Sequence, residues 1–118
     1  MNIGKDTLTL RWMGQMGLMI QSGETKICID YYATPDPRRQ VPPPIPADEL
    51  KDVRAFLGSH NHLDHIDHES WKIWVRTCPK ADFVFPEAHH LEILEDGIPE
   101  ERAHGINDGG EVTFLEKK

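Results

Sequence analysis

Apolar and polar residues alternate in the first quarter of the chain. In residues 7–12 every second residue is apolar, which is the period of a half-buried β-strand. Further apolar segments follow at residues 18–21 and 26–29, and the glycine-containing turn 22–24 separates these two segments. The pattern predicts three strands joined as an antiparallel meander.

The pattern changes to a helical period in the middle of the chain. Residues 53–59 are mostly apolar and predict a buried strand. Asp67 belongs to a residue type favoured at helix N-caps. Beyond it, four residues recur with the spacing of one buried helical face: Trp71, Trp74, Val75 and Cys78.

Short strands and a second helix are predicted for the remainder. The strands are expected at residues 82–85, 104–106 and 111–115. The helix is expected at residues 87–96, with Gly97 at its C-terminal end and Ala88, Leu91 and Leu94 on its inner side. The fold class predicted is therefore α/β (α+β), with a mostly antiparallel or mixed sheet and helices on one face.

Residues 31–46 differ from both patterns, because six of the nine prolines lie there. Proline fixes φ and lacks an N–H donor, so this density excludes a regular element and predicts a proline-rich loop. A length of 118 residues suits one domain with a modest core.

Residues 59–68 carry the densest cluster of metal-ligand residue types. Four of them follow the pattern His-x-His-x-Asp-His: His60, His62, Asp64 and His65. In an extended segment alternate residues point to the same side, so the first three can converge while His65 points elsewhere. This spacing suits two metals about 3.5–4 Å apart, one held by His60 and His62 and the other by Asp64 and His65. Imidazole and carboxylate ligands suit zinc, and also manganese or iron; the alternative is a solvated histidine-rich loop.

The motif resembles the signature of the metallo-β-lactamase superfamily. Other segments resemble the branch of that superfamily that contains L-ascorbate-6-phosphate lactonase and predicted zinc-dependent hydrolases. These segments are residues 12–18 (Trp-Met-Gly-Gln-Met-Gly-Leu), 27–30 (Ile-Cys-Ile-Asp), 65–67 (His-Ile-Asp), 97–102 (Gly-Ile-Pro-Glu-Glu-Arg) and 108–109 (Asp-Gly).

The resemblance implies a fold, an activity and roles for residues. Residues 1–118 would form a single partial domain, the N-terminal half of a four-layer αββα sandwich. The four motif residues would bind up to two divalent ions, with zinc expected first, and Asp64 would also orient a nucleophilic water as the catalytic residue. Asp30 would hydrogen-bond within the ligand loop rather than bind metal. The substrate expected is a small molecule, a lactone or a sugar-phosphate-type ester.

The resemblance also implies that the site is incomplete. Catalytic zinc usually has three protein ligands and a water, whereas the motif offers two ligands for each metal. One hypothesis is therefore the N-terminal part of a metal-dependent hydrolase. The other is a truncated, non-catalytic half-domain that binds metal or oligomerises. Because a half-sandwich would expose an apolar face and strand edges, we expect a homo-oligomer or association with a C-terminal half.

Net charge and cysteine content limit the classes of partner and the cellular compartment that we expect. The net charge of −7 repels phosphate backbones, which argues against a nucleic-acid substrate. Cys28 and Cys78 are too few for a disulfide framework, and we expect both to be buried and reduced, as in a cytoplasmic protein. No segment has the apolar length of a membrane span, and no signal-peptide core is evident at the N-terminus.

Overall fold

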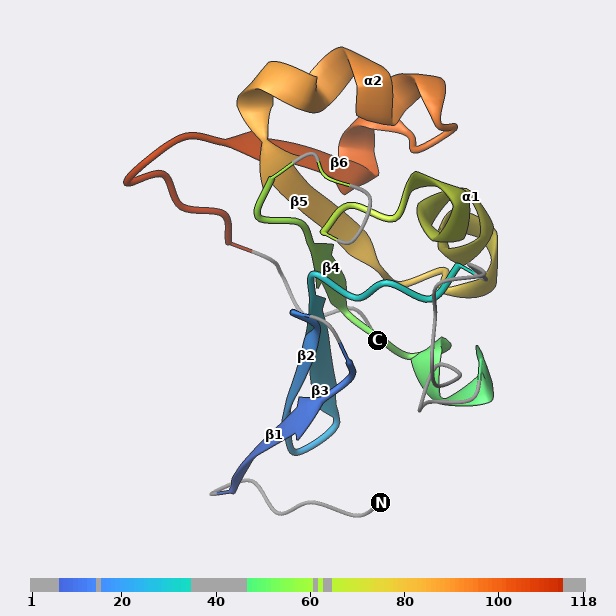
Figure 1. Ribbon diagram of the computed structural model, residues 1–118, viewed down its shortest axis with the longest axis vertical. Helices are drawn as coiled ribbons and strands as arrows, with labels where there is room; N and C mark the ends of the chain where they lie inside the picture. Colours follow the sequence, from blue (N-terminus) through green and yellow to red (C-terminus); the bar gives the residue numbers. More distant parts are fainter. Residues whose placement is uncertain (1–6, 15, 35–46, 61, 63–64, 114–118) are drawn as a thin grey trace.

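A computed structural model describes residues 7–14, 16–34, 47–60, 62 and 65–113 (Figure 1). Its strands are β1 (Leu8–Trp12), β2 (Leu18–Ser22), β3 (Thr25–Ile29), β4 (Ala55–Leu57), β5 (Asp82–Pro86) and β6 (Ala103–Ile106). Its helices are α1 (His68–Thr77) and α2 (His90–Glu95), with 3₁₀ turns η1 (Ala47–Leu50), η2 (Glu87–His89) and η3 (Glu100–Arg102). Most of the predicted proline-rich loop, residues 35–46, lies outside the described residues.

The strands of the described part of the chain form a six-stranded sheet in the order β1-β2-β3-β4-β5-β6. The first three strands pair antiparallel, and the hairpin between β2 and β3 turns at Gly23 with φ +59°. From β3 onward neighbouring strands are parallel, with Ile29 opposite Leu57 and Leu57 opposite Val84. The predicted antiparallel meander is therefore confirmed, and the sheet as a whole is mixed.

One face of the sheet forms the hydrophobic core. Alternate strand residues on this face are buried, among them Met19, Cys28, Phe56 and Phe83, together with the helix residues Trp71, Trp74 and Ile93. Phe56 stacks on Trp74 with ring centroids 4.5 Å apart and on Phe83 at 5.5 Å. The predicted inner face of α1 and the prediction of helices on one face of the sheet are confirmed.

The opposite face of the sheet carries exposed apolar side chains. Leu8, Leu10 and Trp12 of β1 are 64%, 62% and 71% exposed, and Leu18 of β2 lies opposite Trp12 in register. We call these four side chains the open face. Figure 1 shows β1, β2 and β3 extending away from the helices, which lie beside β5 and β6.

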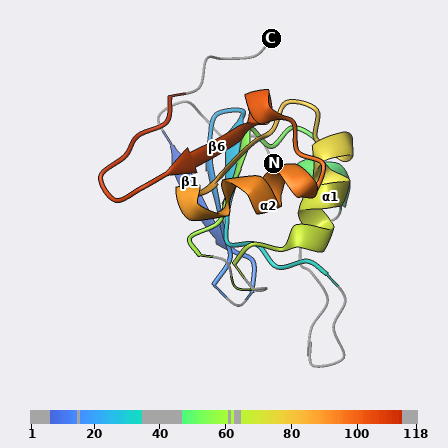
Figure 2. The ribbon, with the colours of Figure 1, turned by 90° about the horizontal axis from the view of Figure 1, so that it is seen from above.

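Polar contacts hold the helices to the sheet and to each other. Asp67 is buried and is the N-cap of α1, as predicted: it accepts hydrogen bonds from the backbone N–H of Ser70 and from the N–H groups of Ala33 and Thr34. α1 and α2 lie next to each other (Figure 1, Figure 2). His68 at the start of α1 pairs with Asp96 at the end of α2. The hydrogen bonds of Asp67 with Ala33 and Thr34 fix the segment after β3 to the start of α1.

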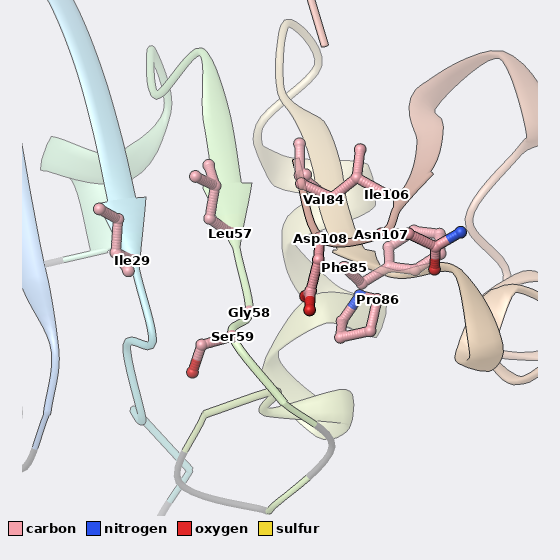
Figure 3. Close-up of a pocket in the computed structure, with 10 residues that line it drawn as sticks. All are labelled: Ile29, Leu57, Gly58, Ser59, Val84, Phe85, Pro86, Ile106, Asn107 and Asp108. Atoms are coloured by element: carbon pink, nitrogen blue, oxygen red, sulfur yellow. The ribbon is translucent and has the colours of Figure 1, made fainter. Parts of the chain in front are cut away.

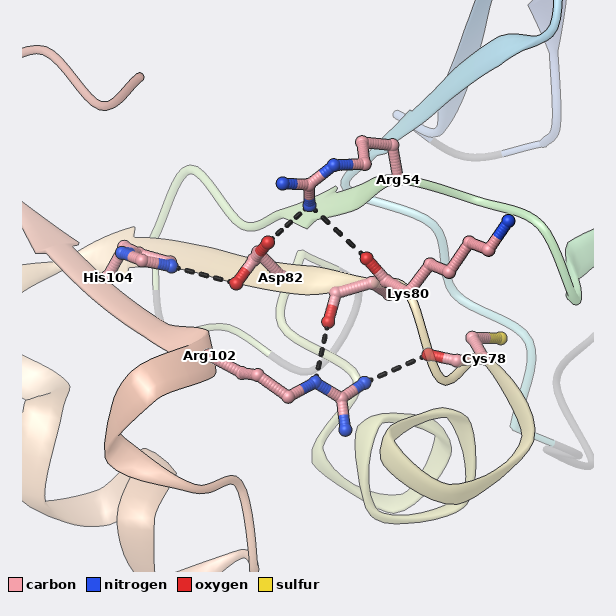
Figure 4. Close-up of polar contacts among 7 residues, drawn as sticks. Arg54, Cys78, Lys80, Asp82, Arg102 and His104 are labelled. Carbon is pink, nitrogen blue, oxygen red and sulfur yellow. Dashed lines mark hydrogen bonds and ion pairs between the residues drawn. The ribbon is translucent and has the colours of Figure 1, made fainter. Parts of the chain in front are cut away.

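Arg102 fixes the other end of α1 (Figure 4). Its guanidinium donates to the carbonyl oxygens of Val75, Cys78 and Ala81 at 2.8–2.9 Å. Beside it, Asp82 lies between Arg54 and His104, the latter at 2.9 Å from Nε2 to Oδ1.

Two predictions about the C-terminal third are wrong. Of the residues expected on the inner side of the second helix, Ala88 and Leu91 are exposed and Leu94 packs against the core, while the buried residue of α2 is Ile93. Residues 111–113 are not in a strand, and the rest of the strand predicted at 111–115 lies outside the described residues. No helix among the described residues has both the length and the apolar composition required to cross a membrane.

Candidate metal centre

The histidine motif lies on a loop between β4 and α1. Gly58 ends the strand with its N–H bonded to the carbonyl of Val84, and the loop folds back over it. A Cβ atom at Gly58 would lie 2.3 Å from Cγ1 of Ile66, so the close approach requires glycine. Ile66 is fully buried, and its N–H bonds to the carbonyl of His62. A strand, a tight turn and a buried anchor therefore fix the loop.

The loop brings three predicted ligands together. The ring centroids of His60 and His65 are 3.7 Å apart, and those of His60 and His62 are 4.5 Å apart. His62 and His65 are more widely separated, at 6.3 Å. The expectation that His65 points away from the first motif histidine is wrong, because the loop turns back and brings its ring closest to that of His60. The fourth predicted ligand and catalytic residue, Asp64, lies outside the described residues.

Asp30 contacts this loop from the end of β3. Its φ of +50° lies in the left-handed region, which aspartate tolerates better than most residues. Its carboxylate accepts hydrogen bonds from the N–H of Ser59 at 2.7 Å, from the Ser59 hydroxyl at 2.7 Å and from Nδ1 of His65 at 2.9 Å. Asp30 therefore links the end of β3 to both Ser59 and His65 and orients the loop between them.

The donor set fits a divalent metal of the zinc type. An imidazole whose Nδ1 donates to a carboxylate has its Nε2 lone pair available as a ligand, and this arrangement is common behind metal-binding histidines. Within the described ranges, no group of three His, Cys, Asp or Glu side chains is placed to hold one ion. In the described part of the loop, imidazole rings lie close together in pairs, His60 with His62 and His60 with His65. The assignments of His60, His62, Asp64 and His65 as metal ligands stay predictions.

A hollow of about 660 Å³ lies beside the loop (Figure 3). Apolar side chains from four neighbouring strands line it: Ile29, Leu57, Val84 and Ile106. Ser59 contributes a polar group where the metal loop begins, and Asn107 and Asp108 contribute polar groups on the side of β5 and β6. The hollow is therefore continuous with the candidate metal centre through Ser59.

The cysteines take no part in the centre. Cys28 and Cys78 are free and buried, as predicted. Burial raises the pKa of the Cys28 thiol from 9.0 to about 12, and the nearby Cys78 adds to the rise. Burial also raises the pKa of the Cys78 thiol. Because the thiolate is the form that binds metal, these cysteines are structural residues.

Sequence reasoning missed Ser59. The residue directly precedes the first histidine of the motif, and its hydroxyl contacts Asp30, His60 and His65. The available signal was its position, a hydroxyl side chain beside a ligand. What that position could not reveal is that Asp30, 29 residues earlier, would lie against it.

Comparisons with known proteins give metal-dependent hydrolases. No family model matches the chain. The chain is 30% identical over 109 residues to a UPF0173 metal-dependent hydrolase from Pyrobaculum islandicum and 28% identical over 111 residues to one from Pyrobaculum arsenaticum. Each alignment covers 91% of this chain and 45% of the relative. The chain is related to metallo-β-lactamase-like metal-dependent hydrolases.

The relationship to this family extends over the N-terminal part of its members. The chain spans less than half the length of the curated relatives that it matches. The fold is also that of Igni18, described as a novel metallo hydrolase from Ignicoccus hospitalis, with a TM-score of 0.65 and 23% identity. That match covers 90% of this chain and 42% of Igni18. The resemblance seen in the sequence is therefore confirmed at the level of family and fold.

Proposed function

We propose that this chain provides the metal-binding half of a metal-dependent hydrolase. The observation that carries the proposal is the convergence of the His60, His62 and His65 rings on one loop that Asp30 holds in place. The relatives, which are described as metal-dependent hydrolases, support the same proposal. The motif provides two ligands for each metal, and catalytic zinc usually has three from the protein. Activity therefore requires further ligands from another part of the protein or from a partner.

Each residue of the loop has a proposed role. His60 and His62 would hold a first ion, Asp64 and His65 would hold a second, and Asp64 would also orient the attacking water. The hydrogen bond from Nδ1 of His65 to Asp30 would leave Nε2 as the ligand atom. A divalent ion here supplies Lewis acidity, which lowers the pKa of water and stabilises the negative charge that develops in ester hydrolysis.

The proposed substrate is a small lactone or a sugar-phosphate-type ester. The resemblance to the lactonase branch supports this class. The hollow beside the loop supports it as well, because apolar side chains with Ser59 on one side and Asn107 and Asp108 on the other suit a small carbon skeleton that carries hydroxyl groups. Zinc is the proposed metal, with manganese or iron as alternatives, and the free buried cysteines suit a reducing, cytoplasmic setting.

The test combines metal content with hydrolysis. The purified chain, offered zinc or manganese, is expected to retain about one or two ions. The double substitution His60→Ala with His62→Ala is expected to remove the first ion and to leave the circular dichroism spectrum unchanged. His89→Ala, which alters a histidine of η2 far from the loop in sequence, is the matched control and is expected to retain metal. Unchanged metal content in the double variant would show that the ligand assignment is wrong.

The second candidate function is a non-catalytic half-domain that oligomerises. The open face favours it, because Leu8, Leu10 and Trp12 expose three apolar side chains side by side on one strand, and a contiguous exposed apolar patch is a feature of association surfaces. Lactone hydrolysis by the metal-loaded chain, alone or once a C-terminal half of a relative supplies the further ligands, would decide for the first function. Metal binding with a mass above that of a monomer, and no hydrolysis even with that half added, would decide for the second.

A further inference from the structure

The polar contacts of the metal loop converge on the hydroxyl of Ser59. Its Oγ lies 2.7 Å from Oδ2 of Asp30, 3.0 Å from Nδ1 of His60 and 3.3 Å from Nδ1 of His65. We propose that Ser59 is a positioning residue that keeps the proton of His60 on Nδ1 and so presents Nε2 of that ring to the metal. The inference rests on the proposed function in that it takes His60 as a metal ligand.

The donors and acceptors around the Ser59 hydroxyl allow one arrangement of the protons. A carboxylate only accepts, so at 2.7 Å the Ser59 hydroxyl donates its proton to Asp30. The hydroxyl has no second proton, so in its contact with His60 the ring nitrogen Nδ1 donates and Oγ accepts. A neutral imidazole protonated on Nδ1 has its lone pair on Nε2. Asp30 therefore acts on His65 directly and on His60 through Ser59.

The side chain of Ser59 is not needed to hold the loop. The backbone N–H of Ser59 donates separately to Oδ1 of Asp30 at 2.7 Å, and alanine preserves that bond. Ser59 is also exposed, so removing its hydroxyl creates no cavity. Ser59→Ala consequently tests the relay to His60 without removing the main attachment of the loop to Asp30. Ser59→Thr keeps an Oγ atom and is the rescuing variant.

The first experiment reads the tautomer of His60 in the metal-free chain. Nitrogen-15 NMR at about pH 8.5, where an ordinary imidazole is neutral, distinguishes protonated from unprotonated ring nitrogens. We expect Nδ1–H for His60 in the wild-type chain and in Ser59→Thr, and a shift of population toward Nε2–H in Ser59→Ala. The same tautomer in all three chains would overturn the proposal.

The second experiment measures zinc affinity by competition with a chromophoric chelator. Loss of a residue that orients a ligand typically lowers affinity about 10- to 100-fold, so we expect at least a tenfold loss for Ser59→Ala and near-wild-type affinity for Ser59→Thr. Equal affinity of Ser59→Ala and wild type, or a wild-type chain that binds no zinc, would overturn the inference. If the wild type binds zinc but hydrolyses no ester even when a C-terminal half of a relative is added, the proposed function fails, and the tautomer and affinity comparisons still decide the role of Ser59.

Discussion

Cys28 shows how burial of a single side chain makes stability depend on pH. The folded chain keeps the thiol protonated up to a pKa of about 12, whereas the unfolded chain loses that proton near its ordinary value of 9.0. The stability that this thiol contributes is therefore complete below pH 9.0 and is lost as the pH rises toward about 12. Above pH 9 the expected slope is about 1.4 kcal/mol per pH unit at most.

Urea unfolding of the wild type and of Cys28→Ala at several pH values between about 8 and 11 tests this expectation, since alanine has no proton to lose. The free energy of unfolding of the wild type should fall relative to that of the variant as the pH rises. A difference that stays constant across this range would contradict the expected effect. The comparison cancels the titration of lysines and tyrosines, which both chains share.

Residue types in the metal loop were predictable from the sequence, but their contacts were not. The spacing of His60, His62 and His65 identified them as candidate ligands, and the family resemblance drew attention to Asp30. The relay through Ser59 depends on the left-handed φ of Asp30, which aims its carboxylate at a loop on the neighbouring strand. Backbone conformation at one residue cannot be derived from a pattern of residue types.

At the scale of elements, Arg102 links η3 to the end of α1. One guanidinium serves three carbonyl groups, and the lysine ammonium lacks the planar fork needed to reach all of them. Hydrogen bonds from charged groups contribute about 1.5–3 kcal/mol. We therefore expect Arg102→Lys to lower the free energy of unfolding by about 2 kcal/mol.

Chemical denaturation measures this loss. Arg76→Lys is the matched control, because Arg76 lies in the last turn of α1 and is exposed. Its substitution should change the free energy of unfolding by less than about 0.5 kcal/mol. Equal effects of the two substitutions would show that the contacts of Arg102 with the carbonyl groups contribute no net stability.

The two helices illustrate where periodicity succeeds and fails. α1 is a regular helix, so the spacing of its tryptophans identified its buried face. α2 follows the 3₁₀ turn η2, which advances about 120° per residue rather than the 100° of an α-helix. That turn changes the phase, and Ile93 rather than Leu91 faces the core. A change of helix type inside a segment is not visible in its apolar pattern.

At the scale of the whole molecule, the open face should decide association. We expect the chain to self-associate at micromolar concentrations and Leu10→Lys with Trp12→Lys to be monomeric, because two charges would have to be buried in the contact. Light scattering measures the mass, and circular dichroism checks the fold. Leu91→Lys, which alters an apolar residue of similar exposure on α2, is the control and should leave the mass unchanged. A monomeric wild type would contradict the oligomer proposal.

The fold class and the order of the elements were predictable because strand and helix periods differ strongly. The family resemblance added the expectation of half of a four-layer sandwich. The pairing of β3 with β4 was not predictable from periodicity. An apolar segment such as Ala55–Leu57 can pair with either neighbour in either direction, and the direction depends on the connection across residues 31–54. Contacts far apart in sequence therefore had to come from the structure.

The sheet order repeats the order of the chain, so each strand pairs with the strand made just before it. During synthesis, the β1–β2 hairpin can form as soon as its residues leave the ribosome. For every later strand, the strand with which it pairs has already been made. Growth by addition at one edge keeps loop closures short and favours rapid folding. A nascent chain of this kind can reach its native pairing without waiting for its C-terminal residues.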